Sequence, residues 1–265
     1  MDWLAEVKSA AEEVLKVLGA GYKEAPYEEA LAHELRIRKI PYERQRNFEI
    51  LYKGYRVGSG RADLIINPLW ANRGGKELVL ELKAVKSITE SHKRQAQVYM
   101  VSLNIDEGAV LSFSDKILLE TVERPKKSLA IEVVKPKKVR EQELKKTLER
   151  CAQEVYDYFG KEFIYREGGE KPFPEAISVE LRLNGIDFSR GNYDILYKGH
   201  KIVEYKFDFV FKNEAVANLV YYKKEENLAE MKEEFDFYRK LFGIKRGFLI
   251  AIPEGEKGKV LVEAV

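Results

Sequence analysis

Residues 76–83 read Lys-Glu-Leu-Val-Leu-Glu-Leu-Lys, an apolar run that ends in two charged residues. The run predicts a buried strand that carries Glu81 and Lys83 at its end. Side chains alternate between the faces of a strand, so these two point the same way and Leu82 points the other way. A buried carboxylate and a buried ammonium are costly unless they are paired or hold a metal. The stretch therefore predicts a chemical site as well as a core strand.

A second acid lies in another apolar strand, within Arg61-Ala62-Asp63-Leu64-Ile65-Ile66. Together the two strands carry the pattern D-x17-E-x-K. Mg²⁺ prefers oxygen ligands, so the expected metal ligands are the carboxylates of Asp63 and Glu81 and the backbone carbonyl of Leu82. Lys83 would contact a phosphate bound beside the metal or orient a water that attacks this phosphate. The alternatives are that the acids are solvated strand ends and that Lys83 only forms an ion pair with them.

Composition narrows the class of protein. The chain has 265 residues, of which 45% are hydrophobic and 34% charged, with a net charge of +2. Affinity for nucleic acid would therefore come from a local basic patch. Cys151 is the sole cysteine, which excludes an internal disulfide and a cysteine zinc site and suits a reducing, cytoplasmic location. No apolar run approaches the ~20 residues of a membrane span, and no signal peptide is expected. The abundance of Lys and Glu suits a heat-adapted organism.

Hydrophobic periodicity predicts an alternation of helices and strands. Helices are expected at 2–18, 25–39 and 88–102, and strands at 48–52, 55–57, 61–66, 77–83, 109–113 and 116–122. The order then repeats: residues 47–54 match 192–199, which share Ile-Leu-Tyr-Lys-Gly, and residues 34–37 match 180–183. Matched residues lie roughly 140–146 positions apart, which predicts two copies of one α/β unit.

Three segments follow from the repeat. Residues 1–122 form the first unit, 123–138 a linker with an extra strand near 129–134, and 139–265 the second unit. In the second unit Asp63 is matched to Asp208, Glu81 to Tyr221 and Lys83 to Lys223. Because a tyrosine cannot replace a carboxylate as a ligand of a hard cation, the second unit is expected to be degenerate.

The first copy resembles the GxxExxY family, a branch of the PD-(D/E)XK nuclease superfamily. The resemblance covers residues 10–115 and rests on four motifs in order: Gly21-Tyr22-Lys23-Glu24-Ala25-Pro26-Tyr27, Arg61-Ala62-Asp63, Glu81-Leu82-Lys83, and Gln95 with Tyr99. Position 62 is alanine instead of the namesake proline. The resemblance implies two tandem restriction-endonuclease-like units, each with a mixed central sheet flanked by helices.

The resemblance also implies roles for helix residues. Glu24 would reach the metal through water or position Lys83, although an acid is also favourable in a first helical turn. Gln95 and Tyr99 share a helix face, where Gln95 would bind a nucleotide phosphate or the metal's water and Tyr99 would stack or bond to a phosphate. Core packing is the alternative for Tyr99. The expected catalytic set is Glu24, Asp63, Glu81, Lys83, Gln95 and Tyr99.

Basic residues near the two strands predict the phosphate contacts that dominate nucleic-acid affinity. The expected nucleic-acid-binding residues are Arg73, Lys86, His92, Lys93 and Arg94. The alternative is a solvated, charged helix end. Trp70 is either a stacking platform or a plug over the core. Glu28 and Glu29 are expected at the surface.

The implied activity is a Mg²⁺- or Mn²⁺-dependent deoxyribonuclease, with DNA as the expected substrate and RNA as the alternative. The second unit would extend the binding surface or stand in for the partner subunit of a nuclease dimer. The chain is expected to be a homodimer or a monomer with an internal pseudo-dimer. The rival hypothesis is a non-catalytic nucleic-acid-binding or scaffold protein that retains a nuclease fold.

Overall fold

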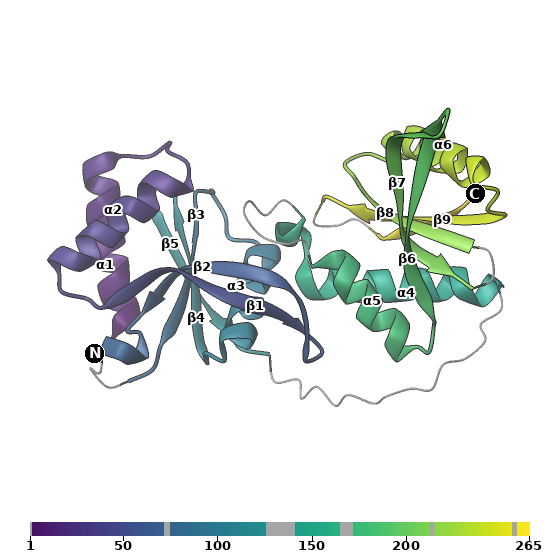
Figure 1. Ribbon diagram of the computed structural model, residues 1–265. Helices are drawn as coiled ribbons and strands as arrows, with labels where there is room; N and C mark the ends of the chain where they lie inside the picture. Colours follow the sequence, from purple (N-terminus) through teal and green to yellow (C-terminus); the bar gives the residue numbers. More distant parts are fainter. Residues whose placement is uncertain (1, 72–74, 126–140, 165–171, 213–214, 256–258) are drawn as a thin grey trace. The chain divides into compact units, whose positions relative to one another are not determined.

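The computed structural model describes residues 2–71, 75–125, 141–164, 172–212, 215–255 and 259–265 (Figure 1). The chain divides into two compact units, one holding the described residues up to 125 and the other those from 141 onward. Each unit contains a five-stranded mixed sheet with helices packed against it. The predicted α/β architecture of two tandem units is therefore confirmed. Among the described helices, none combines the length and apolarity needed to cross a membrane.

The N-terminal unit begins with two helices and continues into a sheet of order β1-β2-β3-β4-β5. Its elements are α1 (Trp3–Leu18), α2 (Glu24–Ile37), β1 (Tyr42–Tyr52), β2 (Tyr55–Ile66), a 3-10 turn (Leu69–Ala71), β3 (Leu78–Lys83), α3 (Glu90–Leu103), β4 (Glu107–Phe113) and β5 (Ile117–Glu123). β3 and β4 are parallel and joined through α3, whereas the other neighbours are antiparallel. The site strands β2 and β3 therefore lie in the interior of the sheet.

The core explains why the charged end of β3 faces a cavity. Leu80 and Leu82 point into a cluster with residues of α1 and α2, such as Val7 and Leu31. α3 packs on the opposite face, so closely that a Cβ on Gly108 would collide with Met100. With one face of β3 committed to the α1 and α2 core, the alternating residues are turned toward the other side.

The C-terminal unit repeats this order, with a sheet β10-β9-β8-β7-β6. Its elements are α4 (Glu141–Phe159), a 3-10 turn (Lys161–Phe163), α5 (Phe173–Leu183), β6 (Phe188–Tyr197), β7 (His200–Phe211), β8 (Ala215–Tyr222), α6 (Asn227–Leu241), β9 (Arg246–Pro253) and β10 (Leu261–Ala264). β8 and β9 are the parallel pair, and a Cβ on Gly247 would collide with Phe235 of α6, as at Gly108 in the first unit.

One detail of the predicted strands differs from the structure, and two others are not tested. The strands predicted at 55–57 and 61–66 are a single continuous strand, β2, because Gly58 and Gly60 lie within the ladder instead of ending it. The extra strand predicted near 129–134 falls outside the described residues, and the boundaries at 122 and 139 stay a prediction.

The predicted match between the active-site strands of the two units was wrong by three residues. Leu64 pairs with Leu80 in the first unit, and Phe209 pairs with Ala217 in the second. With Asp63 equivalent to Asp208, this register makes Asn218 the equivalent of Glu81 and Val220 the equivalent of Lys83. Tyr221 and Lys223 lie beyond those positions. The loop before the strand is shorter in the second unit, which shifts any alignment made by strand pattern alone.

Candidate active site

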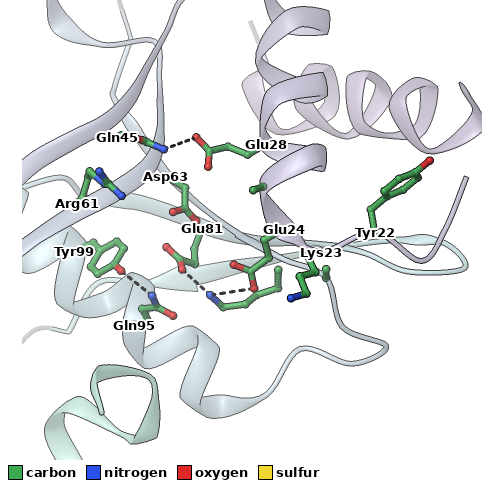
Figure 2. A pocket seen from close by; sticks show the side chains of 13 residues that line it. Tyr22, Lys23, Glu24, Glu28, Gln45, Arg61, Asp63, Glu81, Gln95 and Tyr99 are labelled. Atoms are coloured by element: carbon green, nitrogen blue, oxygen red, sulfur yellow. Dashed lines mark hydrogen bonds and ion pairs between the residues drawn. The ribbon is translucent and has the colours of Figure 1, made fainter. Parts of the chain in front are cut away.

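A cavity of about 650 Å³ lies in the N-terminal unit, between the start of α2, strands β1 to β3 and helix α3 (Figure 2). Its lining residues are Tyr22, Lys23, Glu24, Ala25, Glu28, Gln45, Arg61, Asp63, Glu81, Lys83, Ala84, Gln95 and Tyr99. All six residues of the predicted catalytic set are in this group. Folding therefore brings together side chains from two helices and two strands that are far apart in the sequence.

Lys83 and Glu81 form a buried ion pair at the end of β3. Lys83 Nζ lies 2.8 Å from Glu81 Oε1 and 3.9 Å from Glu24 Oε1 (Figure 2). Burial alone would lower the pKa of Lys83, but the negative charges of Glu81 and Glu24 outweigh it and leave that pKa raised. Lys83 is therefore protonated, and the negative charges of two acids stabilise its positive charge.

Asp63 is held beside this pair by the backbone. Its Oδ2 accepts a hydrogen bond from the N–H of Leu82 at 2.8 Å. Burial, and then the negative charge of Glu81, raise the pKa of Asp63 well above its usual value. Two like-charged carboxylates on one cavity wall thus favour a shared proton or cation.

The donor set fits a hard divalent cation. Among the described residues, no three side chains of His, Cys, Asp or Glu gather closely enough to hold a metal on their own. Mg²⁺ commonly needs only one or two protein carboxylates, because it keeps several waters and takes substrate phosphate oxygens as well. The N–H and C=O of a strand residue point to the same side, so the Leu82 carbonyl faces the side on which Asp63 binds the N–H. Asp63, Glu81 and Leu82 are therefore suited to the predicted ion.

Gln95 and Tyr99 bring α3 to the cavity. Gln95 Nε2 donates to the Tyr99 hydroxyl at 2.7 Å, and both residues are buried. The ring of Tyr99 packs on Phe48 with 5.0 Å between ring centroids, so core packing and a place in the cavity are both realised. Gln95 Oε1 is buried and has no hydrogen-bond partner among the described residues. It is therefore suited to accept from a bound water or ligand.

Glu24 is placed by contacts made further along α2. The Tyr27 hydroxyl donates to the Gly19 carbonyl at 2.9 Å, and its ring stacks on Phe113 at 4.4 Å. On the adjoining turn, Arg44 binds Glu28 at 3.0 Å and Glu29 at 2.7 Å. These contacts fix the first turn of α2 over the end of β3, where half-exposed Glu24 approaches Lys83.

The predicted nucleic-acid-binding residues lie away from this cavity. Of the four that the structure describes, none is in its lining. His92 is buried, and its Nδ1 accepts from the N–H of Thr89 at 3.1 Å, so it caps α3. Lys93 pairs with Glu90 and Glu120, both at 3.0 Å. Arg73 and the side chain of Trp70 fall outside the described residues. Phosphate binding by this group stays a prediction.

Seven lining residues are outside the predicted catalytic set, and four of these have charged or amide side chains. Lys23 and Arg61 stand next to predicted site residues, Lys23 before Glu24 and Arg61 two positions before Asp63, so their spacing contained the signal. The prediction that Glu28 is a surface residue was wrong, because only 13% of its side chain is exposed. Gln45 gave no signal in the sequence.

The equivalent place in the C-terminal unit has a different set of side chains. Asp208 accepts from the N–H of Leu219 at 2.9 Å, as Asp63 does from Leu82. Asn218, however, occupies the Glu81 position, and its Oδ1 accepts from the N–H of Asp208 at 2.9 Å. With Val220 in the Lys83 position, the buried acid and lysine are replaced by an amide and an aliphatic side chain.

Asp63→Asn is expected to stabilise the metal-free protein at neutral pH. Because the folded-state pKa of Asp63 is raised, its ionised form opposes folding, and this penalty appears as pH rises through the unfolded pKa and is complete above the folded pKa. Melting in the presence of a chelator should show a gain of roughly 0.5–2 kcal/mol near pH 8. The gain should vanish below about pH 3, where the carboxyl is mostly protonated in both states. An equal gain at both pH values would contradict this account.

Comparisons with known proteins identify the family of the chain. A family model described as the PD-(D/E)XK nuclease superfamily matches residues 1–124 and 142–261, one region in each unit. No curated protein matches the chain. A solved structure titled "Crystal structure of SSO0001" is similar at 21% identity with a TM-score of 0.32, over 46% of this chain and 62% of that one. The family match covers most of the sequence, and this chain belongs to the PD-(D/E)XK nuclease superfamily.

Proposed function

We propose that the N-terminal unit hydrolyses phosphodiester bonds in DNA with Mg²⁺ as cofactor and Mn²⁺ as a substitute. Nucleases of this superfamily generally use divalent metal ions. The observation that carries the proposal is the convergence of Asp63, Glu81 and Lys83 on one cavity. The motif from Gly21 to Tyr27 further supports placement in the GxxExxY branch.

The proposed mechanism assigns each side chain a task. Asp63 and Glu81, with the Leu82 carbonyl, would hold the ion, which when bound lowers the pKa of a water and offsets charge on the phosphate. Lys83, held by its acids until substrate arrives, would neutralise a non-bridging phosphate oxygen. Water then adds to phosphorus as the bond to the leaving sugar oxygen breaks, and protons are exchanged with solvent.

The surrounding residues would position the substrate. Gln95, with its buried acceptor, would orient a water, and the Tyr99 hydroxyl would stay fixed by the Gln95 amide. Lys23 and Arg61, both exposed at the cavity, would contact neighbouring phosphates, because their charge lies where the backbone must pass. Glu24 would hold Lys83 in line.

The C-terminal unit is proposed to be a degenerate copy that supplies surface instead of catalysis. Asn218 and Val220 replace the acid and the lysine that the reaction needs. The unit would stand in for the partner of a dimer, so that one chain forms an internal pseudo-dimer, with a homodimer as the alternative. A cytoplasmic location and a heat-adapted source stay predictions.

Metal binding separates this proposal from the rival, a non-catalytic nucleic-acid-binding protein. Calorimetry with Mn²⁺ should show one binding event per chain, and Asp63→Ala should weaken it by at least ~10-fold, because a ligand is lost. The same titration of Asp208→Ala is the matched control, with affinity expected to equal that of the unaltered protein. DNA binding without any heat from Mn²⁺ would favour the rival.

A further inference from the structure

One residue in the cavity has an unusual backbone conformation. Gln45 has a φ of 51°, in the left-handed region that residues other than glycine rarely adopt. It lies in β1, whose ladder with β2 is regular over residues 42–50 except at this step. Within the described residues of β1 and β2, Gln45 lies opposite Asp63, but the two residues do not form a strand-to-strand pair. Strain of this kind persists where the surrounding structure holds it, and it is frequent at functional sites.

A hydrogen bond links the Gln45 side chain to α2. Gln45 Nε2 donates to Glu28 Oε1 at 3.3 Å, and the same oxygen accepts from Arg44 Nη2 at 3.0 Å. Gln45 and Glu28 both line the cavity, and Figure 2 shows their side chains meeting on the wall next to Asp63. The left-handed residue therefore belongs to the wall of the proposed site.

The second unit provides an internal comparison. Between the strand-to-strand pairs that flank this position, β6 has one residue, Arg190. At the same place β1 has two residues, Arg44 and Gln45. Arg190 binds Glu175 at 2.5 Å in the way that Arg44 binds Glu29. The arginine clamp on the helix is thus present in both units, and Gln45 is the extra residue of the first.

The partner of Gln45 is also particular to the first unit. Glu28 precedes Glu29, and the residue that precedes Glu175 is Pro174, which has no side-chain acceptor. The C-terminal unit therefore lacks both members of the Gln45–Glu28 pair. It is also the unit in which an amide and a valine replace the acid and the lysine of β3. The Gln45–Glu28 pair is therefore found in the unit that carries the acid and the lysine, and is missing from the unit that lacks them.

We propose that Gln45 is a positioning residue of the N-terminal site: Glu28 holds it left-handed, so that β1 stays unpaired beside Asp63 and the carboxylate stays open to the cavity. The proposal rests on the proposed function, because it concerns access to the same metal-binding carboxylate. The backbone conformation of Gln45, more than its side-chain amide, would keep β1 unpaired from β2 at this position.

Two substitutions at this position separate backbone from side chain. Glycine accepts positive φ without strain, so Gln45→Gly should keep Mn²⁺ affinity within about threefold of the unaltered protein. A β-branched residue disfavours that region, so Gln45→Val should restore pairing and weaken Mn²⁺ binding by at least ~10-fold. Calorimetry measures the Mn²⁺ affinity of both variants. In Gln45→Val, kcat for DNA cleavage should fall by a larger factor than KM rises.

Lys53 offers a matched control, because its φ is 48° at the tip of the same hairpin, outside the cavity lining. Lys53→Val should lower the melting temperature but leave Mn²⁺ affinity unchanged. If Gln45→Val does not fold, Gln45→Ala asks the same question, since alanine also disfavours positive φ. Equal Mn²⁺ affinity in the unaltered protein, Gln45→Gly and the non-glycine variant would overturn the inference. Absence of Mn²⁺ binding by the unaltered protein would instead overturn the proposed function.

Discussion

Asp63→Asn is expected to reduce the cleavage rate of DNA by at least ~10³-fold, equivalent to about 4 kcal/mol of transition-state stabilisation. Asn keeps an oxygen that can accept the Leu82 N–H, so the backbone contact at 2.8 Å survives while the negative charge that would hold the cation is lost. Glu81→Gln should have an effect of the same order, since it removes the other carboxylate of the pair. Neither change adds volume to the cavity.

Asp208→Asn is the matched control for this loss. Asp208 accepts the N–H of Leu219 at 2.9 Å, so the substitution repeats the same structural change in the other unit. Its neighbour is an amide, Asn218, instead of a carboxylate, and cleavage should therefore continue at the rate of the unaltered protein. The measurement is initial cleavage rate with Mg²⁺ on single-stranded, duplex, flapped and four-way DNA. Cleavage that survives Asp63→Asn, or that is lost only in Asp208→Asn, would remove the N-terminal site as the place of reaction.

The charged end of β3 could be predicted from the sequence because it follows from strand alternation alone. Glu81 and Lys83 are two residues apart on a strand whose other face is apolar, and the structure places them 2.8 Å apart. The position of Asp63 followed from the same reasoning, applied to the neighbouring strand. Predictions of this kind depend on residue type and spacing, which the sequence states directly.

Other parts of the site depend on features that residue type does not encode. An acid on a helix is usually exposed, whereas Glu28 is partly buried and is bound by Arg44 and Gln45 of β1. The positive φ of Gln45 occurs where β1 meets α2 in this way. The equivalence of Asn218 to Glu81 depends on loop length, since residues 67–77 separate β2 from β3 whereas only 212–214 separate β7 from β8. The first two misses therefore involve contacts between distant segments, and the third involves a difference in loop length between the units.

Lys83→Val is expected to destabilise the N-terminal unit by about 3–5 kcal/mol, because it removes the cation from a buried acid. The Lys83 and Glu81 side chains are only 8% and 2% exposed, so little solvent is in contact with the carboxylate that would lose its partner. The pKa of Lys83 is raised, so the stability it contributes is complete below the pKa of an unfolded lysine and is lost only as pH rises through the folded-state pKa. The full cost should therefore be seen at pH 7.

The double variant Glu81→Asn with Lys83→Val tests whether this cost comes from the charge left behind. It copies Asn218 and Val220, the side chains that the second unit carries at these positions. A buried ion pair replaced as a whole is often neutral or stabilising, so the double variant should return to within ~1 kcal/mol of the unaltered protein while losing cleavage. Urea unfolding in chelator measures the difference, with hydrogen exchange of β3 amides to assign the transition to the N-terminal unit. A double variant as unstable as Lys83→Val would mean that Lys83 stabilises the unit by packing its aliphatic chain. That result would contradict the inference that Lys83 acts by pairing its charge with Glu81.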